Sequence, residues 1–121
     1  MVVAVIGASS HRHKFGNKAL RAFRNQGHTV IPVNRHEAEV EGERAYRSVL
    51  DYPGAIDEAT VYVPPDEGLS VVEDIAKKGI PIVWLNPGAD GAAVVRRARD
   101  LGLDTRVACS ILAQGESPGD Y

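Results

Sequence analysis

The chain has 121 residues, of which 44% are hydrophobic and 25% are charged, and its formal net charge is -2. This length suits a single domain with one core, spanning residues 1–121, and the composition excludes a disordered or fibrous protein. The small negative charge argues against nucleic acid as a partner, and no apolar run approaches the ~20 residues that span a bilayer, which argues against a membrane segment.

The first sixteen residues predict a strand that turns into a helix through a loop of small residues. Five apolar residues, Val2–Ile6, are typical of a strand buried on both faces. The segment Gly7-Ala8-Ser9-Ser10 lets the backbone approach a bulky anion, and the start of the following helix, near Gly16, favours negative charge. Positive charge from the segment His11-Arg12-His13-Lys14 adds an electrostatic attraction. The sequence therefore predicts a phosphate-binding corner.

Strand and helix patterns alternate along the rest of the chain. The expected elements are a helix over 17–26, a strand over 29–33, a surface loop over 34–44, a short helix over 46–50, a strand over 59–63, a helix with Asp66 as its N-cap and Gly79 at its end, a strand over 80–85, a helix over 92–101, a strand over 103–108 and a flexible tail over 115–121. Pro32 is an objection to a central position for the second strand, because proline cannot donate to a ladder.

This alternation predicts βαβ units with right-handed crossovers and a doubly wound, parallel, five-stranded sheet. Ligands of such sheets bind beyond the carboxyl ends of the strands. The residues at those ends are Gly7-Ala8-Ser9, Val33-Asn34-Arg35, Val63-Pro64-Pro65, Leu85-Asn86-Pro87-Gly88 and Ala108-Cys109-Ser110. Few of them are chemically reactive, and no two have a spacing that suggests a catalytic pair, so the sequence favours binding over catalysis.

The residues at the carboxyl ends of the predicted strands also indicate which nucleotide is bound. A dinucleotide fingerprint would place glycines where this chain has Ser9 and Arg12, and an acid where the second strand ends in Asn34 and Arg35. Both departures argue against unphosphorylated NAD and favour a ribose that carries a phosphate. NADP and coenzyme A (CoA) both meet this description.

At this level of detail the chain resembles the stand-alone CoA-binding proteins of Rossmann type, which are related to the CoA-binding domain of the succinyl-CoA synthetase alpha subunit and of acyl-CoA synthetases. The resemblance covers nearly the whole chain. It rests on Val5-Ile6-Gly7-Ala8-Ser9, Lys14-Phe15-Gly16, Val30-Ile31-Pro32-Val33-Asn34, Gly42-Glu43-Arg44-Ala45-Tyr46, Val63-Pro64-Pro65, Trp84-Leu85-Asn86-Pro87-Gly88-Ala89 and Ala108-Cys109.

The resemblance implies that the Gly7–Ser9 loop and Lys14 hold the CoA phosphates. It also implies that Asn34 and the Val63–Pro65 edge flank the adenosine, and that the Asn86–Gly88 turn closes the pantetheine side. The family usually has proline where this chain has Arg35, so that contact differs here. The chain shows no counterpart of the second domain or the phosphohistidine segment of the ligases, so we do not expect their activity in it.

For three side chains the sequence leaves two roles open. Lys14 contacts a phosphate or is solvated, and Arg35 pairs with a ribose phosphate or with Glu37 or Glu39 in its own loop. Cys109 lies at the ligand edge, where it either reacts with the CoA thiol or, as we favour, is buried and inert.

We therefore predict a single-domain, Rossmann-like α/β protein that binds CoA or an acyl-CoA without catalysis, in the cytoplasm, where its single cysteine stays reduced. We expect no metal site, since His11 and His13 lack further ligands nearby. The alternatives are an NADP-binding reductase or redox-sensing domain, and a CoA-binding subunit of a separately encoded ligase; a homodimer or a ligase partner is compatible with each. The predicted site residues are Gly7, Ala8, Ser9, Ser10, Lys14, Gly16, Asn34, Arg35, Val63, Pro64, Pro65, Asn86, Pro87 and Gly88.

Overall fold

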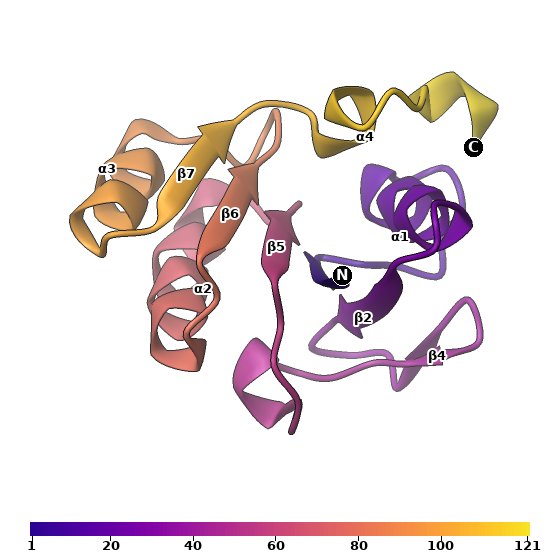
Figure 1. Ribbon diagram of the computed structural model, residues 1–121, viewed down its shortest axis with the longest axis horizontal. Helices are drawn as coiled ribbons and strands as arrows, with labels where there is room; N and C mark the ends of the chain where they lie inside the picture. The colour runs from indigo at the N-terminus through magenta and orange to yellow at the C-terminus, as the bar shows by residue number, and fades with distance from the viewer.

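The computed structural model describes all 121 residues (Figure 1). The elements are β1 (Val2–Ile6), α1 (Phe15–Asn25), β2 (Thr29–Val33), β3 (Glu39–Val40), β4 (Glu43–Arg44), the 3-10 turn η1 (Val49–Asp51), β5 (Glu58–Val61), α2 (Pro65–Lys78), β6 (Ile82–Leu85), α3 (Ala92–Asp100), β7 (Asp104–Val107), α4 (Ser110–Ala113) and the 3-10 turn η2 (Pro118–Asp120). None of the helices combines the length and the apolar character that crossing a membrane requires.

The main sheet has five parallel strands in the order β2-β1-β5-β6-β7. From β1 the chain moves outward to β2 and then returns to the other side of β1 as β5, so the strand order reverses between β1 and β5. Helices α1 and α4 lie on one side of the sheet, and α2 and α3 lie on the other (Figure 1). The predicted doubly wound, Rossmann-like α/β fold is confirmed.

The two faces of β1 contribute to two separate apolar clusters. Val3 and Val5 pack with residues of α1, whereas Ala4 and Ile6 pack with residues of α2 and α3. All four side chains are buried. An uninterrupted apolar run is therefore required here, because a strand covered on both faces exposes neither of its alternating sides to water.

The second strand lies at an edge of the sheet, and this position accommodates Pro32. The carbonyl oxygen of Pro32 accepts a hydrogen bond from Tyr46 N on the outer side (3.0 Å), so the nitrogen of Pro32 also points away from β1. A proline at an outward-facing edge position removes no ladder hydrogen bond. The expected surface loop that follows contains the short β3–β4 hairpin, and the expected helix over 46–50 is the single turn η1.

Helix α2 begins two residues earlier than predicted, and Asp66 is not its N-cap. Pro64 holds the N-cap position without a side-chain hydrogen bond, and Pro65 is the first helical residue. Proline suits this position because the amide hydrogen that it lacks would have had no partner within the helix.

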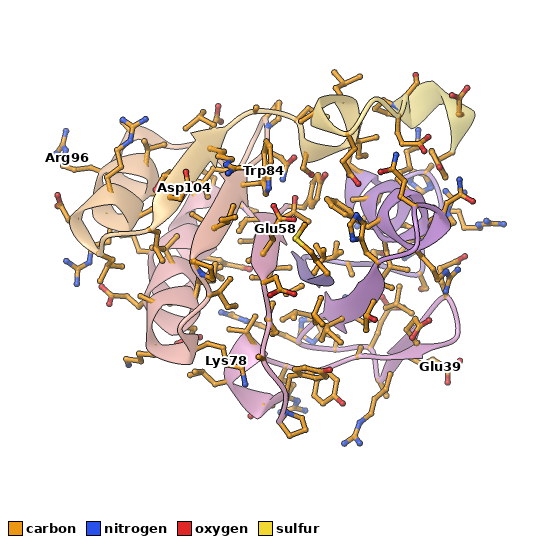
Figure 2. All side chains as sticks on the ribbon, in the orientation of Figure 1. Glu39, Glu58, Lys78, Trp84, Arg96 and Asp104 are labelled. Carbon is orange, nitrogen blue, oxygen red and sulfur yellow. The ribbon has the colours of Figure 1, made fainter.

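Trp84 of β6 is only half buried. Its Nε1 donates to Glu58 Oε1 (3.1 Å), and the Arg106 guanidinium lies 5.1 Å from its ring centre. Figure 2 shows Trp84 and Glu58 on the side of the sheet turned toward the viewer, where no helix lies in front of β6 and β7. The covering helix on this side, α4, is too short to reach these strands.

The C-terminal segment contacts α1, which differs from the flexible tail expected over 115–121. Tyr121 Oη accepts from Asn25 Nδ2 (3.2 Å) and donates to Glu116 Oε2 (3.1 Å). Ahead of it, Ile111 of the unpredicted helix α4 is fully buried in the cluster on the α1 side of the sheet. These contacts hold the segment in place, since its apolar side chains cover a surface that would otherwise be exposed.

The loop after β1 packs directly against the first turn of α1. A Cβ atom at Gly16 would lie 2.2 Å from the carbonyl oxygen of Gly7 and 3.0 Å from its carbon. Both neighbouring atoms belong to the backbone, so no rotamer change relieves the overlap. Only glycine at position 16 allows the loop and the helix to meet in this way.

Gly16→Ala therefore destabilises the protein by about 1–3 kcal/mol, the usual cost of overpacking a core. Helix propensity alone predicts the opposite sign, a gain of up to ~1 kcal/mol for alanine over glycine. Urea denaturation measures the difference. Gly119→Ala is the matched control, because its Cβ would meet only Ser117 Oγ at 3.7 Å. An unchanged or increased stability of Gly16→Ala would contradict the packing described.

Candidate functional site

A cavity of about 330 Å³ opens at the carboxyl ends of β1, β2 and β5, beside the reversal in strand order. This is the position at which open α/β sheets bind ligands. Seventeen residues line the cavity, and six of them are predicted site residues: Gly7, Lys14, Asn34, Arg35, Val63 and Pro64.

The cavity has an apolar floor and a charged rim. The floor comes from the ends of β1 and β2, from η1 and from α2, through Ile6, Val33, Val49, Val63 and Val71. Four basic residues, Lys14, Arg35, His36 and Arg47, and two acidic residues, Glu67 and Asp74, lie around it. Such a surface suits a ligand with a flat apolar part and several charged groups.

Sequence reasoning missed the contribution of α2 to this cavity. Glu67, Ser70, Val71 and Asp74 follow the spacing i, i+3, i+4, i+7 and therefore share one face of the helix. This largely polar stripe, beginning directly after a strand end, is the signal that could have identified them. Arg47, which precedes η1, gave no such signal.

Three cations of the rim remain available to an anion. Lys14, Arg35 and Arg47 are exposed and form no ion pair with a carboxylate of the chain, whereas Arg12, Arg24, Arg97 and Arg106 each do. In particular, Arg35 pairs with neither of the glutamates of its own loop, which was one of its two expected roles.

Two backbone donors of the Gly7–Ser10 loop have no acceptor within the chain. Gly7 has a φ of +92°, a Cβ there would lie 3.1 Å from the Tyr62 carbonyl carbon, and its own amide donates to Val33 O (3.0 Å). The amides of Ala8 and Ser9 donate to no acceptor of the chain. Both residues are buried, with 0% of Ala8 and 7% of Ser9 exposed.

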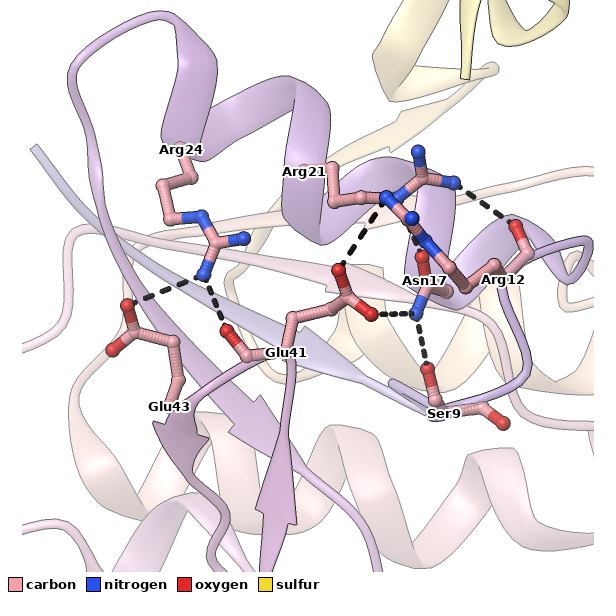
Figure 3. A network of polar contacts seen from close by, with 7 residues as sticks. All are labelled: Ser9, Arg12, Asn17, Arg21, Arg24, Glu41 and Glu43. Atoms are coloured by element: carbon pink, nitrogen blue, oxygen red, sulfur yellow. Dashed lines mark hydrogen bonds and ion pairs between the residues drawn. The ribbon is translucent and has the colours of Figure 1, made fainter.

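A polar network fixes this loop on α1 (Figure 3). The buried Asn17 donates from Nδ2 to Ser9 O (2.8 Å) and accepts at Oδ1 from Arg21 Nε (2.6 Å). Arg12 pairs with Glu41 at 3.6 Å, and Asn17 Nδ2 lies 3.3 Å from the same carboxylate. The β3–β4 hairpin and α1 thus hold the loop from one side.

Asn34 holds the loop from the other side. Its Nδ2 donates to Ala8 O (2.8 Å), and its Oδ1 accepts from the amides of His36 (2.7 Å) and Glu37 (2.8 Å). Both ends of the side chain are therefore engaged with the backbone. Asn34 positions the segments after β1 and β2 relative to each other.

The carboxylate of Glu37 contacts the same loop. It accepts hydrogen bonds from Ser10 N (3.0 Å) and from the Ser10 hydroxyl. These two hydrogen bonds, and to a smaller extent the charges of His11 and Lys14, hold the pKa of Glu37 below its ordinary value. A carboxylate with this shift stabilises the fold above its unfolded pKa, and the contribution is lost as the pH falls through the folded pKa.

Replacing Ser10 with alanine removes the largest cause of this shift, so the pKa of Glu37 rises toward the ordinary value in Ser10→Ala. NMR of the side-chain carboxyl carbon across an acid titration measures it. Ser70→Ala on α2, whose hydroxyl donates to Glu67 O (3.0 Å), serves as the control and leaves Glu37 unchanged. An identical titration in Ser10→Ala and the parent protein would contradict the contact.

The predicted Asn86–Gly88 turn lies outside the cavity, and Asn86 has internal partners. Its Nδ2 donates to Thr60 Oγ1 (2.7 Å) and Val61 O (3.0 Å), and its Oδ1 accepts from Ser110 N (2.8 Å). Only 1% of Asn86 is exposed, whereas Pro87 and Gly88 are open to solvent. The asparagine joins β5, β6 and α4.

Asn86→Ala therefore lowers the free energy of unfolding by about 2–3 kcal/mol, because it leaves buried partners without hydrogen bonds. Chemical denaturation measures the loss. The adjacent, exposed Pro87→Ala is the control, with a change within ±0.5 kcal/mol. Full stability of Asn86→Ala together with a loss of ligand binding would instead make Asn86 a ligand contact.

Tyr62, which follows β5, packs against the apolar cluster on the α1 side of the sheet. Its hydroxyl lies 3.1 Å from Ser110 Oγ, which is 2.8 Å from Thr60 Oγ1, and burial raises the pKa of the phenol. Cys109, half buried and free, packs in the same cluster. The remaining predicted residues do not line the cavity: Ala8, Ser9 and Gly16 are buried, and Ser10 and Pro65 are exposed.

This fold defines an α/β protein with a Rossmann-like sheet and a cavity at its switch point. Residues 1–115 match the family described as CoA binding domain, and the chain belongs to that family. The resemblance stated from the sequence is thereby confirmed.

Relatives of two kinds are similar to the chain. It is 35% identical over 103 residues to the alpha subunit of acetate–CoA ligase [ADP-forming] II from Pyrococcus furiosus, a match that covers 82% of this chain and 22% of that subunit. A solved hypothetical protein from Pyrococcus horikoshii is 32% identical with a TM-score of 0.83, covering 88% of this chain and 74% of the other.

A third relative is the dinucleotide-forming acetyl-coenzyme A synthetase 1 of Ca. Korarchaeum cryptofilum, solved in complex with phosphate and ADP. It is 30% identical with a TM-score of 0.78, and the match covers 89% of this chain and 25% of that one. The chain thus spans about a quarter or less of the length of these two ligase-type relatives.

Proposed function

We propose that this protein binds CoA or an acyl-CoA at the cavity beside Gly7, without catalysing a reaction itself. The observation that carries the proposal is the group of exposed cations without ion-pair partners at the cavity, Lys14, Arg35 and Arg47, next to a loop whose Ala8 and Ser9 amides have no acceptor within the chain. Membership of the CoA-binding domain family supports CoA as the ligand and favours it over NADP.

The diphosphate of the ligand lies on the loop after β1 in this proposal. The Ala8 and Ser9 amides donate to its oxygens, and Lys14 supplies a mobile positive charge that needs no fixed geometry. The first turn of α1 adds the favourable end of the helix dipole. All three features come from the segment between Gly7 and Gly16.

The adenosine lies between the ends of β2 and β5. Val63 and Pro64 present an apolar surface on one side, and Asn34 fixes the backbone on the other. Glu67 and Asp74 are within the same cavity and offer acceptors for ribose hydroxyls or for the adenine amino group. Arg35, with Arg47 at the same rim, is placed to pair with the 3'-phosphate that distinguishes CoA from ADP.

The cavity holds the nucleotide half of CoA and leaves the pantetheine outside. Ligand pockets run from about 300 to 1,000 Å³, so 330 Å³ lies at the small end of this range. The pantetheine then runs over the surface toward Pro87 and Gly88, which are exposed beyond β6. Pro65, at the start of α2, lies between the two regions along the sheet edge.

The polar groups of the cavity favour binding over chemistry. Ser48 Oγ lies 3.4 Å from Asp74 Oδ2, beyond the 2.6–3.2 Å reach of a general base, and the same oxygen accepts from Leu50 N as the cap of η1. The other serine of the cavity, Ser70, donates to Glu67 O. Neither serine has the arrangement of an activated nucleophile.

Isothermal titration with CoA, 3'-dephospho-CoA, NADP and NAD tests the proposal. CoA binds most tightly and raises the melting temperature, because a ligand of the native state alone stabilises it by mass action. Lys14→Ala weakens CoA binding by about 1–3 kcal/mol, the range for a charge-assisted hydrogen bond. Lys77→Ala, an exposed lysine of α2 outside the cavity, leaves it unchanged. Binding of NADP with no binding of CoA would overturn the proposal.

Arg35→Ala separates recognition of the 3'-phosphate from general charge. It weakens CoA by about tenfold and leaves 3'-dephospho-CoA unaffected, since only CoA offers the phosphate that Arg35 pairs with. Arg96→Ala, on α3 far from the cavity (Figure 2), removes the same charge and changes neither affinity. Equal losses for both ligands would remove Arg35 from the 3'-phosphate.

A subunit role in a ligase is the second candidate. The observation that favours it is the similarity to the separate alpha subunit of the Pyrococcus furiosus ligase. Purification of the tagged protein from its native cells decides between the two: an ATP-grasp protein that co-purifies in stoichiometric amount supports the subunit role, and an isolated monomer or homodimer contradicts it.

A further inference from the structure

The loop after β1 is already in contact with an anion, the carboxylate of Glu37. Ser10 donates to this carboxylate from its backbone amide (3.0 Å) and from its hydroxyl, and Asn34 Nδ2 lies 3.3 Å from Oε2. Three donors from two segments converge on one carboxylate. An oxygen of a phosphate group would use donors of the same kind.

The position of Glu37 is fixed by its own backbone. Its amide donates to Asn34 Oδ1 (2.8 Å), and Asn34 Nδ2 donates to Ala8 O (2.8 Å). The turn after β2 is thereby locked onto the loop, with the carboxylate facing Ser10. The nearby charges of His11 and Lys14 favour the ionised form of this carboxylate.

The donors of the loop are consequently divided into two sets. Ser10 serves Glu37, whereas the amides of Ala8 and Ser9 have no acceptor within the chain. A phosphate that approached Ser10 would meet a fixed negative charge and would have to displace it. A phosphate on the cavity side of the loop, at Gly7 and Lys14, would not have to displace that charge.

We infer that Glu37 is an affinity- and specificity-determining residue: its carboxylate reserves Ser10 and directs the phosphates of the ligand to the cavity side of the loop, where Gly7 and Lys14 lie. This inference rests on the proposed function, because it takes the loop as the anion site. It also means that the Ser10 hydroxyl binds Glu37 in the ligand-free loop and does not contact a phosphate.

Titration of Glu37→Gln with CoA and with inorganic pyrophosphate tests the inference. Removal of the charge frees Ser10 and raises the affinity for both anions by about three- to tenfold, the worth of one hydrogen bond. Glu39→Gln is the matched control, because Glu39 lies two residues further on, is exposed (Figure 2) and makes no side-chain hydrogen bond or ion pair. Its affinity changes by less than about twofold, since salt screens exposed charges over ~10 Å.

Ser10→Ala identifies the donor that is released. In the Glu37→Gln background it lowers the affinity for pyrophosphate, because the freed hydroxyl is part of the gain; in the parent protein it does not. Glu37→Asp retains the charge and draws the carboxylate back from Ser10 by one methylene group, so it gives a smaller gain and covers the case in which Glu37→Gln fails to fold.

The inference is overturned if Glu37→Gln binds CoA and pyrophosphate no more tightly than Glu39→Gln does, or more weakly than the parent protein. Glu37 would then organise the binding loop. The proposed function fails separately. If the parent protein binds pyrophosphate and responds to Glu37→Gln as described, but binds no CoA, the role of Glu37 stands and CoA is the wrong ligand. If none of the proteins binds either anion, both are wrong.

Discussion

The contact between two glycines, Gly7 and Gly16, is the constraint on which the rest of the site depends. The Gly7 carbonyl oxygen occupies the space where any other residue at position 16 would place its Cβ, only 2.2 Å away. Because of this contact, α1 begins directly beneath the loop. The amides of Ala8 and Ser9, which have no acceptor within the chain, then share one corner with the helix start and the reversal in strand order.

At this corner, the charged side chains that are available to a ligand are those without a partner in the chain. Arg12 is tied to Glu41, and Glu37 is tied to Ser10, so these charges serve the loop itself. Lys14 and Arg35 have no such partners and line the cavity. A near-neutral protein can in this way present cations without ion-pair partners at the loop, because the carboxylates of Glu37 and Glu41 are engaged with Ser10 and Arg12.

Local patterns sufficed to predict the strands and their carboxyl ends. The strand Thr29–Val33 has the predicted bounds, since its apolar run and the preceding Gly27 mark both limits. The family resemblance was also visible in short motifs at those ends and is confirmed. Six of the predicted site residues line the cavity, because the residues at and near the strand ends can be identified from the sequence.

Features that depend on packing between distant segments were not predicted. Glu67 and Asp74 lie in the cavity because α2 packs beside the strand ends, and only the shared face that they form on the helix pointed to this in the sequence. Asn86 follows a strand end, as a ligand contact would, yet the approach of Ser110 turns it inward. The docking of Tyr121 on α1 likewise joins residues 96 positions apart.

Amide NMR during a titration with CoA tests the central claim most directly, because it reports on the loop without any substitution. The account predicts that the largest chemical-shift changes fall on Ala8 and Ser9, where two unpartnered N–H groups acquire acceptors. Shifts confined to α3 and β7, with none at Ala8 or Ser9, would contradict it.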